Sequence, residues 1–322
     1  MLAALLAFAF PVAPVDVYIL AGQSNMEGHA KVALMDVQAG QPVYKPFRTG
    51  EKWRVRDDVT INFLDRRGQL TVGYGVPGSI GPELGFGAVV GDRTKAPVLL
   101  IKTAWGGKSL WRDFRPPSAG LPPQDVLDKI LSNERKNRPE TTPAEVRESF
   151  GVYYRAMLSE VRETLAELGT RFPNLKGRQP ALKGLIWFQG WNDMIDARAT
   201  AEYTKNLACF IRDARKDLAV PKLPVVVGQM GVEGAKPSTN IATFKAAEAA
   251  IMDLPEFRGN VALVKTDAFW DTEAQAVFDS GWKEHPEEWA KVGSDMPYHY
   301  LGSAKTMIGI GRAFGEAVLR LK

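Results

Sequence analysis

The sequence predicts an α/β protein, a three-layer α/β/α sandwich around a central parallel sheet of about five strands. Two observations predict this fold: short runs rich in Val, Ile and Leu recur along the 322 residues, and amphipathic helical patterns alternate with them. The runs are almost continuously hydrophobic, which is typical of strands that are covered by helices on both faces. Hydrophobic residues make up 45% of the chain and charged residues 24%, which is ordinary for a globular protein with a large core.

Each expected element can be placed by its pattern. The strands are expected at residues 15–21, 97–103, 183–189, 223–229 and 260–266. Apolar residues spaced three and four apart predict helices at residues 151–168, 200–218 and 303–321. The alternation of the two kinds of element favours parallel strands joined by helical crossovers.

The chain is expected to form one domain over residues 15–322, with long insertions near residues 108–150 and 267–298. Residues 1–14 are apolar and are followed by small residues, so they predict an export signal and a periplasmic or extracellular protein. The alternative is a plain N-terminal extension of a cytoplasmic protein. The run is too short to be a stable membrane anchor.

Composition excludes several classes of function. The net charge is only +4 and the basic residues are scattered, so no nucleic-acid partner is expected. Cys209 is the only cysteine, which excludes an internal disulfide bond and favours an inert buried thiol. The three histidines lie far apart in sequence and no Cys pair accompanies them, so neither a metal nor another cofactor is expected.

Polar or flexible residues follow every expected strand. Ligands of open parallel sheets bind beyond the carboxyl ends of the strands, so these residues are expected to converge on one crevice. They are Ser24 after the first strand, Gly106 and Gly107 after the second, Gln189, Asn192 and Asp193 after the third, Gln229 after the fourth and Asp267 after the fifth.

Ser24, in the stretch Ala-Gly-Gln-Ser-Asn-Met, is the candidate nucleophile. Ester hydrolysis by a serine passes through a negatively charged tetrahedral intermediate, whose oxyanion needs hydrogen-bond donors. Glycine allows a backbone N–H to approach a substrate closely. The N–H groups of Ser24 and of Gly107 or Gly106, together with the Gln189 amide, are the expected donors. The alternative is that Ser24 only caps a helix, because Glu27 three residues later completes a capping box.

His299 is the candidate general base. It precedes the last helical pattern, and Asp295 stands four residues before it as the carboxylate that orients the ring. His29 is expected to point away from the site along the segment after Ser24. His285 stands beside a proline in a charged stretch and is expected in an exposed loop.

Four blocks, AGQSNM, AWGGKSLW, WFQGWND and SDMPYHY, stand in the order of the conserved blocks of the SGNH hydrolases. The first three resemble specifically the carbohydrate acetylesterase branch that includes sialate O-acetylesterase-like proteins. The resemblance covers nearly the whole chain from about residue 15. It implies a flavodoxin-like α/β/α fold, no metal, and removal of acetyl groups from sugar hydroxyls.

The chain departs from the family pattern in two places. Trp191 stands where the third block commonly carries a glutamate, so the acid role passes to Asp295, with Asp193 as the second choice. Asp295 and His299 are four residues apart, whereas the family usually places the two residues three apart.

The expected partner is an acetylated carbohydrate. Aromatic rings stack on sugar rings, and residues near the blocks are candidates for substrate contact or support: Gln23, Asn25, Trp105, Trp191, Asn192 and Asp193. Two other functions remain open, a lipolytic esterase of the same fold and a carbohydrate-binding protein without activity. The replaced glutamate favours the second of these.

Overall fold

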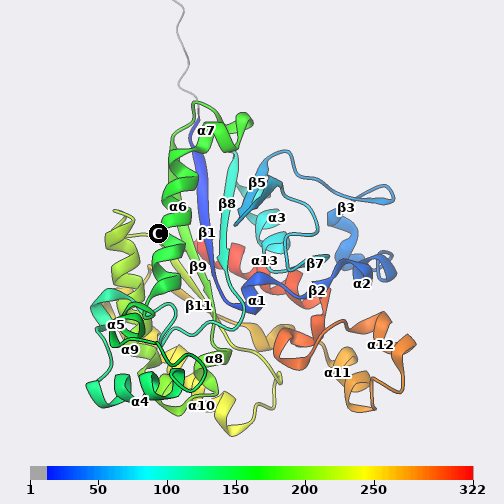
Figure 1. Ribbon diagram of the computed structural model, residues 1–322. Helices are drawn as coiled ribbons and strands as arrows, with labels where there is room; N and C mark the ends of the chain where they lie inside the picture. The colour runs from blue at the N-terminus through cyan, green and yellow to red at the C-terminus, as the bar shows by residue number, and fades with distance from the viewer. Residues whose placement is uncertain (1–12, 322) are drawn as a thin grey trace, which may run out of the picture.

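The computed structural model describes residues 13–321, which form a seven-stranded sheet with helices on both faces (Figure 1). The expected export signal falls almost wholly on residues 1–12 and lies outside the described residues. Within residues 13–321, no helix combines the length and the apolar character that crossing a membrane requires.

The strand order of the main sheet is β11-β10-β9-β1-β8-β5-β6. All neighbours are parallel except β6, which forms an antiparallel edge with β5. The strands are β1 (Val15–Gly22), β5 (Val59–Phe63), β6 (Arg66–Gln69), β8 (Val98–Ala104), β9 (Pro180–Phe188), β10 (Val225–Gln229) and β11 (Val261–Lys265). Two small antiparallel pairs lie outside this sheet: β2 (Ala30–Lys31) with β7 (Ser79–Ile80), and β3 (Arg48–Thr49) with β4 (Lys52–Trp53).

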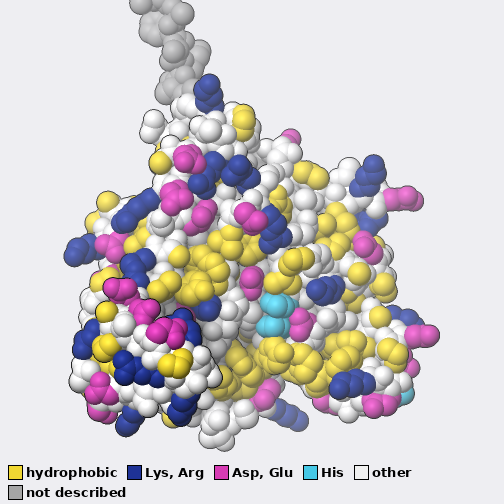
Figure 2. Space-filling view, in the orientation of Figure 1, with side chains coloured by type: hydrophobic (Ala, Val, Ile, Leu, Met, Phe, Trp, Pro, Cys, Tyr) yellow, Lys and Arg dark blue, Asp and Glu magenta, His cyan; other side chains and the backbone are white. Residues whose placement is uncertain are grey.

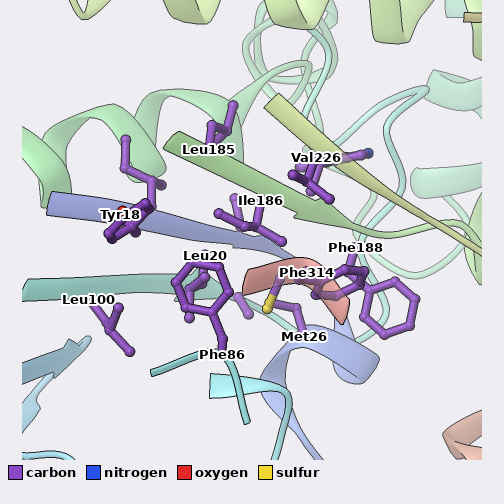
Figure 3. Close-up of a cluster of buried hydrophobic side chains, with 14 of the residues drawn as sticks. Tyr18, Leu20, Met26, Phe86, Leu100, Leu185, Ile186, Phe188, Val226 and Phe314 are labelled. Atoms are coloured by element: carbon purple, nitrogen blue, oxygen red, sulfur yellow. The ribbon is translucent and has the colours of Figure 1, made fainter. Parts of the chain in front are cut away.

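The two helical layers are identified by their contacts with the sheet. On one face, Phe86 of α3 (Glu83–Arg93) packs edge-on against Tyr18 at 5.3 Å, and Phe314 of α13 (Ala304–Arg320) packs against Phe188 at 5.3 Å (Figure 3). On the other face, Phe210 of α9 lies 4.3 Å from Trp187. The main helices of these layers are α3 (Glu83–Arg93), α6 (Val152–Ala166), α9 (Ala197–Asp217), α10 (Thr239–Ala249) and α13 (Ala304–Arg320). Because neighbouring residues of one strand face opposite layers, the sheet is buried on both sides.

The predicted fold class is therefore confirmed, with a larger sheet than expected. The five predicted strands correspond to β1, β8, β9, β10 and β11, and the three predicted helices correspond to α6, α9 and α13. The sheet continues through β5 and β6 beyond β8.

Both long insertions fold into short helices. Residues 108–150 contain α4 (Gln124–Glu134) and α5 (Pro143–Glu148), and residues 267–298 contain α11 (Thr272–Asp279) and α12 (Pro286–Val292). The remaining α-helices are α1 (Ser24–Glu27), α2 (Val32–Val37), α7 (Leu168–Arg171) and α8 (Trp191–Met194). In Figure 1, α4 and α5 lie at the same end of the sheet as α8, and α11 and α12 lie beyond α1.

In the sheet, β1 lies between β8 and β9, so the strand order reverses at β1. Ligands of open parallel sheets bind beyond the carboxyl ends of the strands at such a reversal, and the candidate site lies there. The carboxyl ends of β1 and β9 approach closely at Gly22, where a Cβ atom would lie 2.1 Å from the carbonyl oxygen of Phe188. Glycine is required by this contact, and it brings the residues after β1 next to those after β9.

Candidate active site

Ser24 is the first residue of the short helix α1, directly beyond the end of β1. The N-cap position belongs to Gln23, which makes no side-chain cap hydrogen bond, so the capping-box alternative for Ser24 and Glu27 is not what the structure contains. Ser24 is 7% exposed. Its backbone carbonyl accepts a hydrogen bond from the Gly28 N–H at 2.8 Å, and its hydroxyl has no hydrogen bond with His299 in the described residues.

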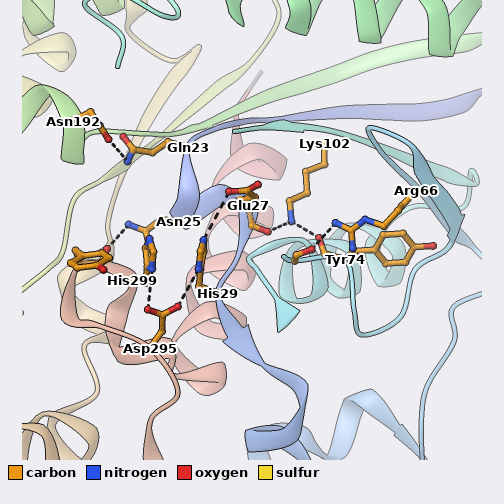
Figure 4. Close-up of polar contacts among 12 residues, drawn as sticks. Gln23, Asn25, Glu27, His29, Arg66, Tyr74, Lys102, Asn192, Asp295 and His299 are labelled. Atoms are coloured by element: carbon orange, nitrogen blue, oxygen red, sulfur yellow. Dashed lines mark hydrogen bonds and ion pairs between the residues drawn. The ribbon is translucent and has the colours of Figure 1, made fainter. Parts of the chain in front are cut away.

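The side chains on either side of Ser24 join the opening segment to other parts of the site (Figure 4). The Gln23 amide donates to the Asn192 side chain at 3.1 Å, and its oxygen accepts from Gly190 N at 3.2 Å. The Asn25 amide donates to the carbonyl oxygen of Tyr298 at 3.1 Å. Residues more than 160 positions apart are thus held around Ser24, and the candidate support residues Gln23, Asn25 and Asn192 make these contacts.

The segment that carries His299 is anchored by the residue after it. Tyr300 is fully buried, and its hydroxyl accepts from Gly231 N at 2.7 Å and lies 2.6 Å from the Thr266 hydroxyl. Tyr300 and Leu301 both have positive φ angles, 54° and 60°, which are unusual for residues with a Cβ atom. Buried contacts hold this strained turn in place, as is common near functional sites.

Asp295 contacts two histidines. Its two carboxylate oxygens lie 3.2 Å from His299 Nδ1 and 3.1 Å from His29 Nδ1, and Met296 N donates to it at 2.6 Å. Burial alone would raise the pKa of Asp295, but these hydrogen bonds outweigh it and hold the pKa below its usual range. Asp295 therefore lies where an orienting carboxylate is needed, and the four-residue spacing does not separate it from His299.

The expectation for His29 is wrong. Its ring stacks on the ring of His299, with centroids 3.7 Å apart and planes inclined by 22°. Burial lowers the pKa of His29, but hydrogen bonding and the charges of Asp295 and Glu27 raise it overall. His285 is exposed, as expected, at the start of α12. Figure 2 shows histidine side chains at the centre of this face, with acidic and hydrophobic side chains around them.

The loop after β8 lies against Ser24. A Cβ atom on Gly106 would lie 3.9 Å from Ser24 Cβ and 3.0 Å from a Glu27 oxygen, so the backbone of this loop faces Ser24. Gly107 has a φ of 71° and open space where a side chain would be. Both glycines are exposed, which leaves room for a substrate beside them.

Gln189 and Asp193 form a buried hydrogen-bonded pair that contacts the loop after β8. The Gln189 amide donates to Asp193 at 2.6 Å, to the Gln23 oxygen at 3.0 Å and to the Lys108 carbonyl at 3.0 Å. An amide has only two N–H groups, so none is left for an oxyanion, and the structure differs here from the expected role of Gln189. The carboxylate of Asp193 accepts from Leu110 N and Trp111 N, both at 2.8 Å. Asp193 therefore supports the glycine loop and does not contact His299.

Aromatic side chains lie beside the histidines. Trp191 lies 5.5 Å from Tyr298, and the Tyr298 ring lies edge-on to His299 at 4.5 Å. Tyr298 is 37% exposed, and Trp191 is partly exposed. Trp105 instead packs inward against Tyr153 at 5.1 Å and Phe114 at 6.0 Å. Trp191 and Tyr298 are thus the aromatic groups that a ligand near His299 can reach.

Among residues 13–321, one group of metal-binding atoms is close together, on His29, Asp295 and His299, with the atoms within 4.8 Å of one another. The lone pair of an imidazole nitrogen lies in the plane of its ring, and these two planes are stacked and nearly parallel. The two lone pairs cannot meet at one ion at normal bond lengths of about 2.0–2.1 Å. The arrangement fits two imidazoles that share one carboxylate.

Lys102 lies under α1 with no exposed surface. Its ammonium group donates to the carbonyl oxygens of Glu27 and Tyr74 and to the Glu83 carboxylate, each at 2.7 Å (Figure 4). The pair of Lys102 and Glu83 is fully buried. A cation in the core thus fixes the end of the helix that begins with Ser24.

Replacing Asp193 with asparagine is expected to weaken both the fold and the site. Three donors point at the carboxylate, whereas an amide offers one acceptor oxygen, so at least one buried N–H loses its partner at a cost of about 1–3 kcal/mol. Denaturant unfolding measures this loss, and the exposed Asp253→Asn variant is the control. Equal stability of the two variants would show that Asp193 does not support the loop.

The same variant changes the pH dependence of stability. Burial raises the pKa of Asp193 to about 6, from an ordinary 3.8. The folded protein then binds this proton more tightly than the unfolded chain does, so the free energy of unfolding falls as the pH rises from about 4 to 6. Asp193→Asn is expected to lack this contribution, and urea titrations across that range measure it.

The fold is shared with solved structures of low sequence identity. A protein from Arabidopsis thaliana matches with a TM-score of 0.55 at 16% identity, over 95% of this chain and 98% of that protein. A carbohydrate acetylesterase from Xanthomonas citri matches with a TM-score of 0.52 at 15% identity, over 95% of this chain and 56% of that one. The protein named NanS matches with a TM-score of 0.54 at 16% identity, over 96% of this chain and 98% of that one. At these identities, the likeness concerns the fold.

A comparison with family models identifies the chain more closely. Residues 14–280 match the SASA family, described as a carbohydrate esterase and sialic acid-specific acetylesterase. No curated protein matches the chain with significance. The family match includes Ser24, Gly106, Gly107 and Asp193 and ends before Asp295 and His299. Because the match spans most of the sequence, this chain belongs to the SASA family of carbohydrate esterases and is a carboxylic ester hydrolase.

Proposed function

We propose that this esterase removes O-acetyl groups from carbohydrates through an acetyl-enzyme formed on Ser24. The observation that carries the proposal is the hydrogen bond from Asn25 to the carbonyl of Tyr298, at 3.1 Å. It holds the residue after the serine against the residue before His299, although the two segments are 273 positions apart. This contact supports a site in which His299 acts as the base for Ser24 and Asp295 orients His299.

The geometry supports a definite role for each group. The Ser24 hydroxyl attacks the acetyl carbonyl while His299 Nε2 takes its proton, and Asp295 holds Nδ1 of the same ring. The tetrahedral oxyanion accepts hydrogen bonds from the backbone N–H groups of Ser24 and of Gly107 or Gly106. His299 then gives the proton to the departing sugar oxygen. Water attacks the acetyl-enzyme with His299 again as the base, and His299 returns the proton to the Ser24 oxygen as the acetyl–serine bond breaks and acetate leaves.

The choice of an acetylated sugar is supported by the family and by the aromatic groups near His299. The family description names a carbohydrate esterase and an acetylesterase. Trp191 and the exposed ring of Tyr298 can pack against the apolar face of a sugar. Trp191, where the family pattern carries a glutamate, thus fits substrate contact, since Asp295 already contacts His299.

Labelling with a fluorophosphonate followed by peptide mapping tests the nucleophile. The reagent is expected to modify the peptide that contains Ser24 and to stop acetate release with one label per chain. Ser24→Ala protein, which should stay unlabelled, is the control. A label on another serine, or full inhibition without a label on Ser24, would contradict the proposal.

A series of acyl esters separates an acetylesterase from a lipolytic esterase of the same fold. We expect kcat/KM to be highest for acetyl esters and to fall as the acyl chain is lengthened. A rise with chain length would favour the lipolytic alternative. Sugar binding without turnover or labelling would instead support a binding protein.

A further inference from the structure

His29 lies in the site without a role in the reaction proposed above. It follows α1 and enters the small strand β2, while His299 comes from the other end of the chain. The two rings are stacked at 3.7 Å, and each uses Nδ1 to contact a different oxygen of Asp295, at 3.1 and 3.2 Å (Figure 4). One carboxylate therefore holds two parallel imidazoles.

The other nitrogen of His29 is enclosed. Within the described part of the chain, His29 Nε2 is buried and has no hydrogen-bond partner. The carboxylate of Glu27 lies 3.9 Å from it, which is beyond hydrogen-bonding distance but close for a charge. A proton on Nε2 would thus face Glu27, and a proton on Nδ1 would face Asp295. Each ring nitrogen of His29 thus faces a carboxylate, and both carboxylates favour the protonated ring.

His29 also restricts the ring of His299. One face of that ring is covered by His29, and Tyr298 lies edge-on to the ring at 4.5 Å. With Nδ1 on Asp295, these contacts leave His299 little freedom to rotate. Misplacing a catalytic group by about 1 Å can cost about 100-fold in rate.

We propose that His29 is a positioning residue: it holds Asp295, the carboxylate that orients His299, and when protonated it opposes protonation of His299. The inference rests on the proposed role of His299 as the base for Ser24. Two imidazolium rings in contact repel each other, so the pair accepts its first proton readily and its second with difficulty. A proton on His29 therefore opposes the transfer of the Ser24 proton to His299, and activity is expected to fall as His29 becomes protonated.

The charges around His29 agree with this assignment. Those that face it are Glu27 from α1, and Asp295 and His299 from the C-terminal segment, and the ammonium group of Lys102 lies against the Glu27 backbone. Despite burial, contacts with Asp295 and Glu27 raise the pKa of His29 above its ordinary value. Activity is therefore expected to fall on acidification at a higher pH than an isolated imidazole would cause.

Two substitutions separate the effects of His29. His29→Asn keeps a donor for Asp295 and removes the charge, whereas His29→Phe keeps the stacked ring and removes both the donor and the charge. We expect kcat to fall about 10- to 100-fold in His29→Phe with little change in KM, and to recover to within about 3-fold of wild type in His29→Asn. A purely structural role would not be rescued in this way.

The direct test is an imidazole ¹⁵N NMR titration, which does not depend on turnover. The chain has only three histidines, and the exposed His285 serves as an internal reference. In the wild type, His29 and His299 should titrate in two coupled steps. In His29→Asn, the two coupled steps should be replaced by a single step.

The outcomes distinguish this inference from the proposed function. Identical titration of His299 in the wild type and both variants, or unchanged kcat and unchanged acid limb in both, would overturn the role of His29. If the two rings titrate together but Ser24 is neither labelled nor needed for acetate release, the proposed function fails and the coupling of the rings stands.

Discussion

Replacing Ser24 with alanine is expected to abolish acetate release, lowering kcat by about 10⁴- to 10⁶-fold. In the proposed mechanism, the acetyl-enzyme cannot form without the hydroxyl, and the remaining groups can only orient water near the ester. The fold should be unaffected, because the start of α1 has no side-chain cap hydrogen bond to lose. Steady-state kinetics on an activated acetyl ester measures the change, and circular dichroism verifies the fold.

A matched serine-to-alanine control separates this effect from general damage. Ser280 is exposed at the end of α11, where its hydroxyl only donates to the carbonyl of Val277. Ser280→Ala should keep wild-type kcat and KM. If Ser24→Ala retains more than about one hundredth of the wild-type kcat, Ser24 is not the nucleophile.

The sheet could be predicted from the sequence where its strands are buried on both faces. The runs that form β1 and β8 are buried along nearly their whole length, so continuous hydrophobicity identifies them. The edge strand β6 reads Arg-Arg-Gly-Gln and alternates between partly and fully exposed residues, so it carries no apolar signal. Its neighbour β5 is fully buried but only five residues long, and Thr60 and Asn62 interrupt its apolar pattern.

The residues of the candidate site that directly follow a strand could be predicted from the sequence. Ser24, Gly106 and Gly107 follow β1 and β8 closely, so the topology alone places them together. The contact of His29 with Asp295 depends on the turn at Gly28, whose φ of 93° redirects the chain after α1. Hydrophobic periodicity does not indicate such a turn. The glycine directly before His29 was the feature of the sequence that could have indicated it.

The contacts of Gln189 could not be predicted from the sequence for a related reason. Its position after β9 was right, but three internal acceptors already surround its amide. These acceptors come from three separate segments of the chain, and only the folded structure brings them together. The sequence placed the polar groups near the site without revealing which of them bind each other.

Replacing Lys102 with methionine is expected to destabilise the protein by about 3–5 kcal/mol, because it leaves a buried carboxylate without its cation. Glu83 has no exposed surface, and the carbonyls of Glu27 and Tyr74 lose their donor as well. Burial lowers the pKa of Lys102, and the charge of Glu83 opposes that shift. Chemical denaturation measures the loss, with the exposed Lys95→Met as the control, expected within about 0.5 kcal/mol of wild type.

The double variant Lys102→Met with Glu83→Gln identifies the origin of that loss. If the unpaired charge dominates, the neutral amide should restore much of the stability, since its oxygen can still accept from Gly81 N as the Glu83 carboxylate does at 2.8 Å. The carbonyl of Glu27 would remain without its donor, so the labelling of Ser24 should stay slower than in the wild type even where stability recovers. Full recovery of labelling would show that Lys102 serves only the core, whereas recovery of stability alone ties this buried cation to the placement of Ser24.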